Sequence, residues 1–318
     1  MSLKKILLML LTSVLVLIPV TGCQGTKYTP IELVPLGANL IANIHISKIV
    51  NDQDIRDAYD KAEKGPDYPQ TVEEALDELA EEAGIDIEDF TQAMVFMDIT
   101  TLEETEYIGF IAEGDFNEKQ FISNIEEKAG EKFTTIDYNG NKLYAIEEEE
   151  FTIAFLDKNI LIGGSTQAVK DIIDVSEDDR KPITGPILDT YHHLGDTLIK
   201  VAFELPEEAQ EAITEEPIMG EIPISFEPFA DIDIVGFSLN KDKETLNIRI
   251  EPHFLNTDSA QNAGDTISGA ISLFKGMLQE PEIKELLGKV EVTVSDSWMT
   301  IAFEITMSEI ERLMETFK

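Results

Sequence analysis

Apolar runs of strand length, separated by turns of two or three residues, constrain the fold of this chain more than any other feature. Asn139 and Gly140 stand between two such runs, 133–138 and 142–146, and both residue types tolerate the positive φ angles of a tight hairpin turn. Similar runs flank 157–158, and others flank 241–243. Such short links join antiparallel neighbours, because parallel strands need a much longer crossover. Hairpins mixed with helices therefore predict an α+β fold with largely antiparallel sheets.

Helical patterns occupy the intervals between these hairpins. Thr71 and Glu74 form a capping-box pattern ahead of apolar residues that recur with helical spacing as far as Gly84. The pattern of 260–278 is typical of a long amphipathic helix. Ser165 and Ser308 are expected to cap two further helices.

Two long stretches of the chain share one order of elements. The order is β-α-β-β-α-β-β-β-β-α in 31–175 and β-α-β-β-α-β-β-α in 187–318, and a polar stretch with two prolines, 176–186, separates them. We therefore expect two related halves that arose by duplication, joined by a linker at 176–186. Each half should be a largely antiparallel sheet with packed helices.

The first 22 residues have the three regions of an export signal. Lys4 and Lys5 supply the positive charge, and the following 6–20 is almost wholly aliphatic. A run of this length falls short of the ~20 residues that span a bilayer, so it predicts a cleaved signal peptide and not a lasting transmembrane helix.

The signal ends in Val20, Thr21, Gly22 and Cys23, which resembles the lipobox of bacterial lipoproteins. The resemblance implies cleavage before Cys23 and lipid on that cysteine, which is the only one in the sequence; the alternative is a buried core cysteine behind an ordinary signal. We expect a membrane partner bound through this lipid, a tether at 23–30, and a location on the extracytoplasmic face of the cell envelope. Gln24 after the cysteine implies the outer membrane if the organism has one.

The charge of the chain excludes one class of function. Without Lys4 and Lys5 the chain keeps 24 − 2 = 22 basic residues against 63 acidic ones, a net charge of 22 − 63 = −41. Such a surface repels phosphate backbones, so we expect no nucleic-acid partner. Once Cys23 carries lipid, neither a disulfide nor cysteine catalysis is available.

Histidines and carboxylates offer weak metal candidates. His192 and His193 adjoin Asp189 and Asp196, a combination that suits zinc, but neighbouring residues point apart and a solvated loop is the competing interpretation. The densest acidic run, with Glu147 and Glu148, and the pair Asp231 and Asp233 could bind calcium loosely or simply be solvated. For His45, which alternates with Ile44 and Ile46 on an expected strand, and for His253 we expect structural roles. No cofactor is expected.

A glycine pair marks the junction at Gly163, Gly164, Ser165 and Thr166. Backbone amides there could bind an anion, or the segment could be a helix cap preceded by two turn glycines. The sequence has no Gly-x-Ser-x-Gly motif. We therefore expect a non-enzymatic protein, with a hydrolytic enzyme as a remote alternative.

An apolar stripe on the helix at 260–278 suggests what such a protein could bind. Ile267, Ala270, Ile271, Phe274 and Leu278 share one helix face. They could line a cavity for a hydrophobic, lipid-like ligand between sheet and helices, or pack into the core. The sequence thus leaves two functions open, a non-enzymatic module that binds or organises something at the cell envelope and a carrier of a hydrophobic ligand.

Two segments carry a resemblance to a known group. The segment 82–90, Glu-Ala-Gly-Ile-Asp-Ile-Glu-Asp-Phe, and the strand-turn-strand-helix segment 151–174 resemble elements of a family of uncharacterised, duplicated extracytoplasmic α+β lipoproteins, a domain of unknown function. The resemblance implies a fold and a location but no activity.

Overall fold

The structure is a computed structural model that describes residues 27–61, 68–83, 85–100, 107–146, 149–206, 208–210 and 227–316. The chain divides into two compact units. Unit 1 comprises Met1–Asp98 and Leu102–Thr184, and unit 2 comprises Ile99–Thr101 and Gly185–Lys318. Each unit is an antiparallel sheet with helices packed on it, so the protein has the α+β fold that the hairpin pattern predicts.

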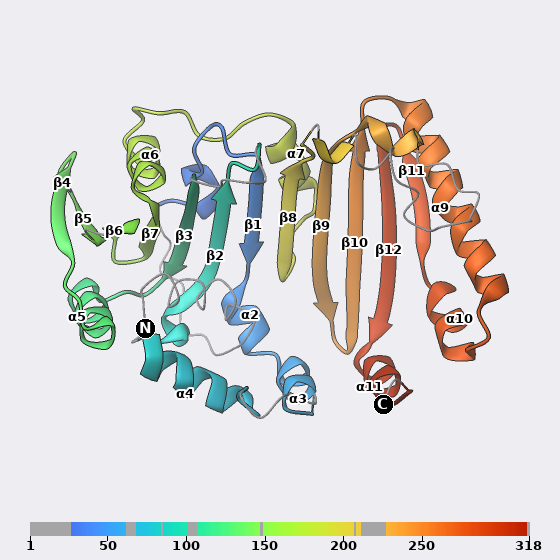
Figure 1. The fold of residues 1–318 in the computed structure, drawn as a ribbon, viewed down its shortest axis with the longest axis horizontal. Helices are drawn as coiled ribbons and strands as arrows, with labels where there is room; N and C mark the ends of the chain where they lie inside the picture. Colours follow the sequence, from blue (N-terminus) through green and yellow to red (C-terminus); the bar gives the residue numbers. More distant parts are fainter. Residues whose placement is uncertain are drawn as a thin grey trace. The chain divides into compact units, whose positions relative to one another are not determined.

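Unit 1 begins with a short 3-10 helix and a single strand, which helices follow, and its hairpins come later (Figure 1). In chain order its elements are η1 (Pro30–Leu33), β1 (Leu40–Ile44), α2 (Ile46–Val50), α3 (Gln53–Lys61), α4 (Val72–Ala83), η2 (Ile87–Asp89), β2 (Phe90–Met97), β3 (Ile108–Gly114), α5 (Glu118–Ala129), β4 (Thr134–Tyr138), β5 (Asn141–Ile146), β6 (Glu149–Asp157), β7 (Ile160–Ser165) and α6 (Thr166–Ser176). The strands pair in the order β1-β2-β3-β7-β6-β5-β4.

Unit 2 also combines strands and helices. Its elements are α7 (Pro186–His193), β8 (Ile199–Glu204), η3 (Glu227–Asp231), β9 (Ile232–Asp242), β10 (Thr245–Phe254), α9 (Thr257–Met277), α10 (Pro281–Leu287), β11 (Glu291–Ser295), β12 (Trp298–Thr306) and α11 (Met307–Thr316). The strand order is β8-β9-β10-β12-β11. In both units the third strand pairs with the last one, and the last pairs with the strand before it. Common ancestry of the two halves, and the linker at 176–186, stay predictions.

Local sequence signals account for several elements. Asn139 and Gly140 have φ angles of 51° and 79° and turn the β4–β5 hairpin. The Thr71 hydroxyl accepts a hydrogen bond from the Glu74 amide (3.2 Å), and Glu74 accepts one from the Thr71 amide, as a capping box requires. The expected stop at Gly84 lies outside the described residues.

Other local expectations are wrong. The residues around His45 do not continue a strand, because α2 begins at Ile46 with His45 as its N-cap. The last helix starts at Met307, one residue before Ser308, and the Thr306 hydroxyl accepts the hydrogen bond of the Glu309 amide (3.2 Å).

Gly163 and Gly164 are not turn glycines. Both belong to β7, and only the cap at Ser165 agrees with the prediction, since its hydroxyl accepts from the Ala168 amide. A Cβ on Gly164 would lie 2.2 Å from the carbonyl oxygen of Ile108, and Gly164 has a φ of +137°. The glycine therefore allows β3 and β7 to pair closely.

Replacing Gly164 tests this explanation. Gly164→Ala should lower the free energy of unfolding by about 3 kcal/mol, because backbone strain adds to the clash with Ile108. Gly140→Ala is the control, since a Cβ there meets nothing within 4 Å and only the left-handed φ costs about 1 kcal/mol. Equal losses in urea unfolding would contradict the close-approach argument.

Candidate functional site

The sheet of unit 2 has two faces of different chemistry, which its register fixes. Val201, Phe237, Ile250 and Ile301 lie in one cross-strand row, and residues directly opposite each other point to the same face. With the neighbouring rows they form what we call the open face: Ile199, Val201, Phe203, Val235, Phe237, Leu239, Leu246, Ile248, Ile250, Ile301 and Phe303. Every one of these apolar side chains keeps some exposure to solvent, and Ile250 is 39% exposed.

Helix α9 covers one end of the open face. Ala260, Ala263 and Met299 form a buried cluster with Phe229, Ile232 and Phe254. A Cβ on Gly264 would lie only 2.6 Å from Val294 on β11, so the helix approaches the sheet closely there. Figure 1 shows α9 running alongside β11.

Beyond Gly264, α9 buries none of its side chains. Ile267 still packs against the buried cluster, whereas Ala270, Ile271, Phe274 and Leu278 are partly exposed. Leu273 and Met277 are 43% and 64% exposed. The predicted apolar stripe therefore starts as core packing and continues as partly exposed surface.

The opposite face carries a polar cluster around Trp298, the only tryptophan in the sequence. The rings of His193 and Trp298 stack with centroids 5.1 Å apart, and the ring of His253 lies 4.8 Å from the same indole. His253 Nδ1 is 2.7 Å from Asp233 Oδ1. His193 Nε2 is 3.2 Å from Glu251 Oε2.

Glu251 is the most constrained member of this Trp298 cluster. Its side chain is completely buried, and Arg249 Nη2 lies 2.6 Å from Oε1. Despite these short distances, neither carboxylate oxygen has a hydrogen bond of acceptable geometry to a described residue. Buried carboxylates normally satisfy their oxygens with several donors, so this one is an exception.

Helix α7 brings His193 to the cluster. Pro186 occupies its first turn, where a fixed φ and a missing amide suit a helix start. A Cβ on Gly236 would lie 3.0 Å from Leu194 and 3.1 Å from Thr190, so this glycine lets the helix lie close to β9. The interpretation of His192 and His193 as a loop is therefore wrong, because both form the last turn of α7.

The metal candidates separate in the structure. His192 points to Tyr191 rather than to Trp298. Asp231 accepts hydrogen bonds from Asn256 and Ser259 at the start of α9, while Asp233 faces His253. Across the part of the chain that is described, no three histidine, cysteine or acidic side chains are placed to hold a metal ion. Glu147 and Glu148 lie outside the described residues.

Sequence reasoning missed Arg249, Glu251 and Trp298 as members of one cluster. A signal was present, since Arg249, Glu251 and His253 alternate with Ile250 and Pro252, the spacing that places them on one face of a strand. Recognition of the cluster also required the pairing of His253 with Trp298, which the sequence does not supply.

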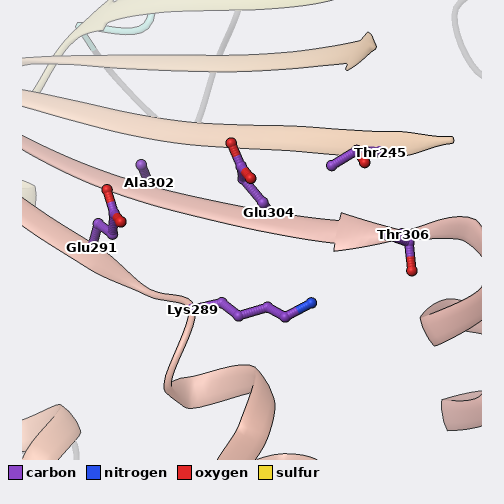
Figure 2. A pocket seen from close by; sticks show the side chains of 6 residues that line it. All are labelled: Thr245, Lys289, Glu291, Ala302, Glu304 and Thr306. Carbon is purple, nitrogen blue, oxygen red and sulfur yellow. The ribbon is translucent and has the colours of Figure 1, made fainter. Parts of the chain in front are cut away.

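Two described cavities are lined by other residues than the open face and the Trp298 cluster, although Ala302 in one of them pairs with Arg249 across β10 and β12. One of about 330 Å³ in unit 2 is shown in Figure 2 and is lined by Thr245, Lys289, Glu291, Ala302, Glu304 and Thr306. Another of about 760 Å³ in unit 1 is an open hollow between the start of α5 and the β6–β7 turn. Neither is lined by α9, so neither is the expected cavity between sheet and long helix.

Lys289 in the smaller cavity already forms an ion pair with Glu309. Its ammonium lies 2.5 Å from Glu309 Oε1. That hydrogen bond, together with the one from the Thr306 amide to Oε2 (2.9 Å), lowers the pKa of Glu309 to about 2. The cation thus stabilises the start of α11 and is not available for an anionic ligand.

Comparisons with known proteins bear on the fold alone. No protein-family model and no curated protein matches the chain. Among solved structures, crystal form IV of TP0453 is 10% identical, with a TM-score of 0.50 over 92% of this chain and 97% of that one. Crystal form III of the same protein is 9% identical, with a TM-score of 0.48 over 91% of this chain and 99% of that one. The similarity is one of α+β fold and spans nearly the whole of both chains.

None of the helices in the described ranges combines the length and the apolar character of a membrane span. The leader at 1–22 and the residues Val20, Thr21, Gly22 and Cys23 lie outside the described part. Lipid attachment stays a prediction of the sequence.

The low pKa of Glu309 predicts a pH-dependent contribution to stability. Because the folded pKa lies below the ordinary 4.5, the contribution is fully present above pH 4.5 and is lost as the pH falls toward 2. Glu309→Gln should reduce the unfolding free energy at pH 7 by about 1 kcal/mol. The difference from the unmodified protein should shrink below pH 4.5 and be lost as the pH falls through about 2 in denaturant titrations.

Glu285→Gln is the matched control for this measurement. Glu285 faces Arg312 at 3.6 Å, with both side chains at least half exposed, and such surface pairs contribute little. A loss as large as that of Glu309→Gln would show that the capping interaction is not the cause.

Proposed function

We propose that this protein is a non-enzymatic binding module, held by lipid on Cys23 at the extracytoplasmic face of the cell envelope, on the outer membrane if the organism has one. The leader, its position before Cys23 and the uniqueness of that cysteine support the anchor. The open face of unit 2 is the observation that carries the binding role, because its apolar side chains adjoin one another and all keep some exposure to solvent, and soluble proteins seldom expose large contiguous apolar patches.

The composition of the open face favours a hydrophobic ligand over a protein partner. The face is made of aliphatic side chains with Phe203, Phe237 and Phe303. Energetic centres of protein interfaces are enriched in Trp, Tyr and Arg, whereas ligand sites are lined mainly by hydrophobic and aromatic side chains. A tether that keeps the module beside a membrane also keeps it beside lipid-like molecules.

The Trp298 cluster gives no support to the hydrolase alternative. A histidine base needs a nucleophile within hydrogen-bond reach. Among the described residues, the polar partners of His193 and His253 are carboxylates, and neither ring is hydrogen-bonded to a hydroxyl. The chemistry of this cluster is that of charge pairing.

Removal of Cys23 tests the anchor. Cys23→Ala should leave the protein in the soluble fraction or stall it as the uncleaved precursor, because two or three acyl chains supply the durable attachment. Gln24→Ala keeps the cysteine and should stay with the membranes. Membrane fractionation and intact mass measurement of both variants decide the matter; a Cys23→Ala protein that behaves like the unmodified one would refute the anchor.

A charge on the open face tests the ligand site. Ile250→Glu should weaken binding of Nile red, an uncharged hydrophobic probe, on the order of tenfold, because the new carboxylate must be desolvated. Thr293→Glu places the same charge on the exposed opposite face of β11 and should leave binding unchanged. Equal binding by both variants would contradict the assignment of the site.

Native mass spectrometry of the protein from its own cells separates the two binding classes. A hydrophobic ligand appears as added mass of lipid size that Ile250→Glu lacks. A co-purifying protein lost in the same variant would instead establish the protein-binding alternative.

A further inference from the structure

We propose that His193, Glu251 and Trp298 form a proton-operated latch, which holds the last turn of α7 on the sheet of unit 2 at acidic pH and loosens it as the pH rises. The inference is independent of the anchor and of the open face. It rests on the geometry of the Trp298 cluster alone.

The first argument compares two buried carboxylates that each have an arginine. Asp171 in unit 1 is 2% exposed and is fully satisfied, with Tyr107 (2.8 Å), Gln167 (2.8 Å) and Arg180 (2.9 Å) around it. Glu251 is completely buried but has no well-formed hydrogen bond. An ionised carboxylate in that state is costly, so a second cation beside it gains an unusually strong interaction.

The second argument is that His193 is placed to be that cation. Its Nε2 is 3.2 Å from Glu251, and its ring is nearly parallel to the indole of Trp298, at 21°. An imidazolium gains charge attraction from both the carboxylate and the aromatic face, whereas a neutral imidazole keeps only its stacking on the indole and the donor capacity of one ring nitrogen. Because histidine is the side chain whose charge ordinarily responds to pH near neutrality, protonation adds this attraction and deprotonation removes it.

The surrounding charges set the direction of the response. With both histidines neutral, Arg249, Glu251 and Asp233 sum to 1 − 2 = −1, and with His193 and His253 protonated the sum is 3 − 2 = +1. His253 keeps Asp233 at 2.7 Å as its own counter-ion, so the gain in charge at His193 is directed to Glu251.

Other groups hold α7 in place at every pH. The Lys200 ammonium, from β8, lies 3.8 Å from the centre of the Tyr191 ring and donates to the Gly195 carbonyl (2.8 Å). Burial raises the pKa of Tyr191, and the negative charge of Asp196, which follows the helix, raises it further. Lys200 therefore holds the last turn of α7 on both sides of His193 at every pH, and the latch adds a further contact to this turn when His193 is protonated.

Trp298 supplies a direct optical readout, since protonated histidine quenches a stacked indole. Its fluorescence in the full chain should fall as the pH is lowered from 8 to 5. His193→Gln and His253→Gln should each remove part of this change, and His192→Gln, on the same turn but away from the indole, should leave it intact. A titration that is the same in His193→Gln as in the unmodified protein would overturn the proposal.

Amide hydrogen exchange measures how firmly the last turn of α7 is held on the sheet. After correction for the intrinsic pH dependence of exchange, protection of residues 189–195 should be on the order of tenfold greater at pH 5.5 than at pH 7.5. This difference should disappear in His193→Gln and shrink in the isosteric Glu251→Gln, while protection in β12 stays constant. Protection of α7 that does not depend on pH in the unmodified protein would equally refute the latch.

Discussion

The antiparallel register of β8, β9, β10 and β12 is the constraint on which the rest of unit 2 depends. Side chains alternate between faces along each strand, so a slip of one residue would exchange the open face with the polar one. Such a slip would turn Arg249 and Glu251 toward α9 and would place Ile248 and Ile250 under α7. The tight turn at Lys243, with its φ of 54°, and the buried contacts of α7 and α9 on opposite faces select the same register. The two candidate sites are therefore two consequences of one pairing pattern.

The acid excess of the chain has opposite effects at different positions. Lys289 holds the pKa of Glu309 well below its ordinary value, whereas burial, followed by the charges of Asp86, Asp115 and Glu88, raises the pKa of Asp89 to about 6. A carboxyl whose folded pKa is raised binds its proton better in the folded state, so its effect on stability becomes less favourable as the pH rises from about 4 to about 6. With 63 acidic and 24 basic residues, few carboxylates can find a cation. The arginines beside Asp171 and Glu251 are placed where an unpaired charge would cost most.

Sequence patterns predicted the elements whose signals are local. The β4–β5 hairpin follows from Asn139 and Gly140, and the start of α4 follows from Thr71 and Glu74. Helix α7 was missed because its start, Pro186, also fits a linker. The role of Gly164 was missed because it depends on β3, more than fifty residues earlier in the chain. The Trp298 cluster depends on three strands and one helix, and only the register shows that His253 faces Trp298. Local chemistry thus predicts turns and caps, while sites need the pairing of distant strands.

The two faces of β10 connect the ligand proposal with the latch. Arg249 and Glu251 belong to the Trp298 cluster, and Ile248 and Ile250, their neighbours in the chain, belong to the open face. A ligand that packs on Ile250 restrains the same backbone that positions Glu251 below His193. The ligand could bind better when the last turn of α7 is held on the sheet. In that case protonation strengthens ligand binding, and thermodynamic linkage requires the ligand to strengthen protonation by the same factor. Ligand affinities that are equal at acidic and at alkaline pH would instead show that alternate residues of one strand can serve two independent sites.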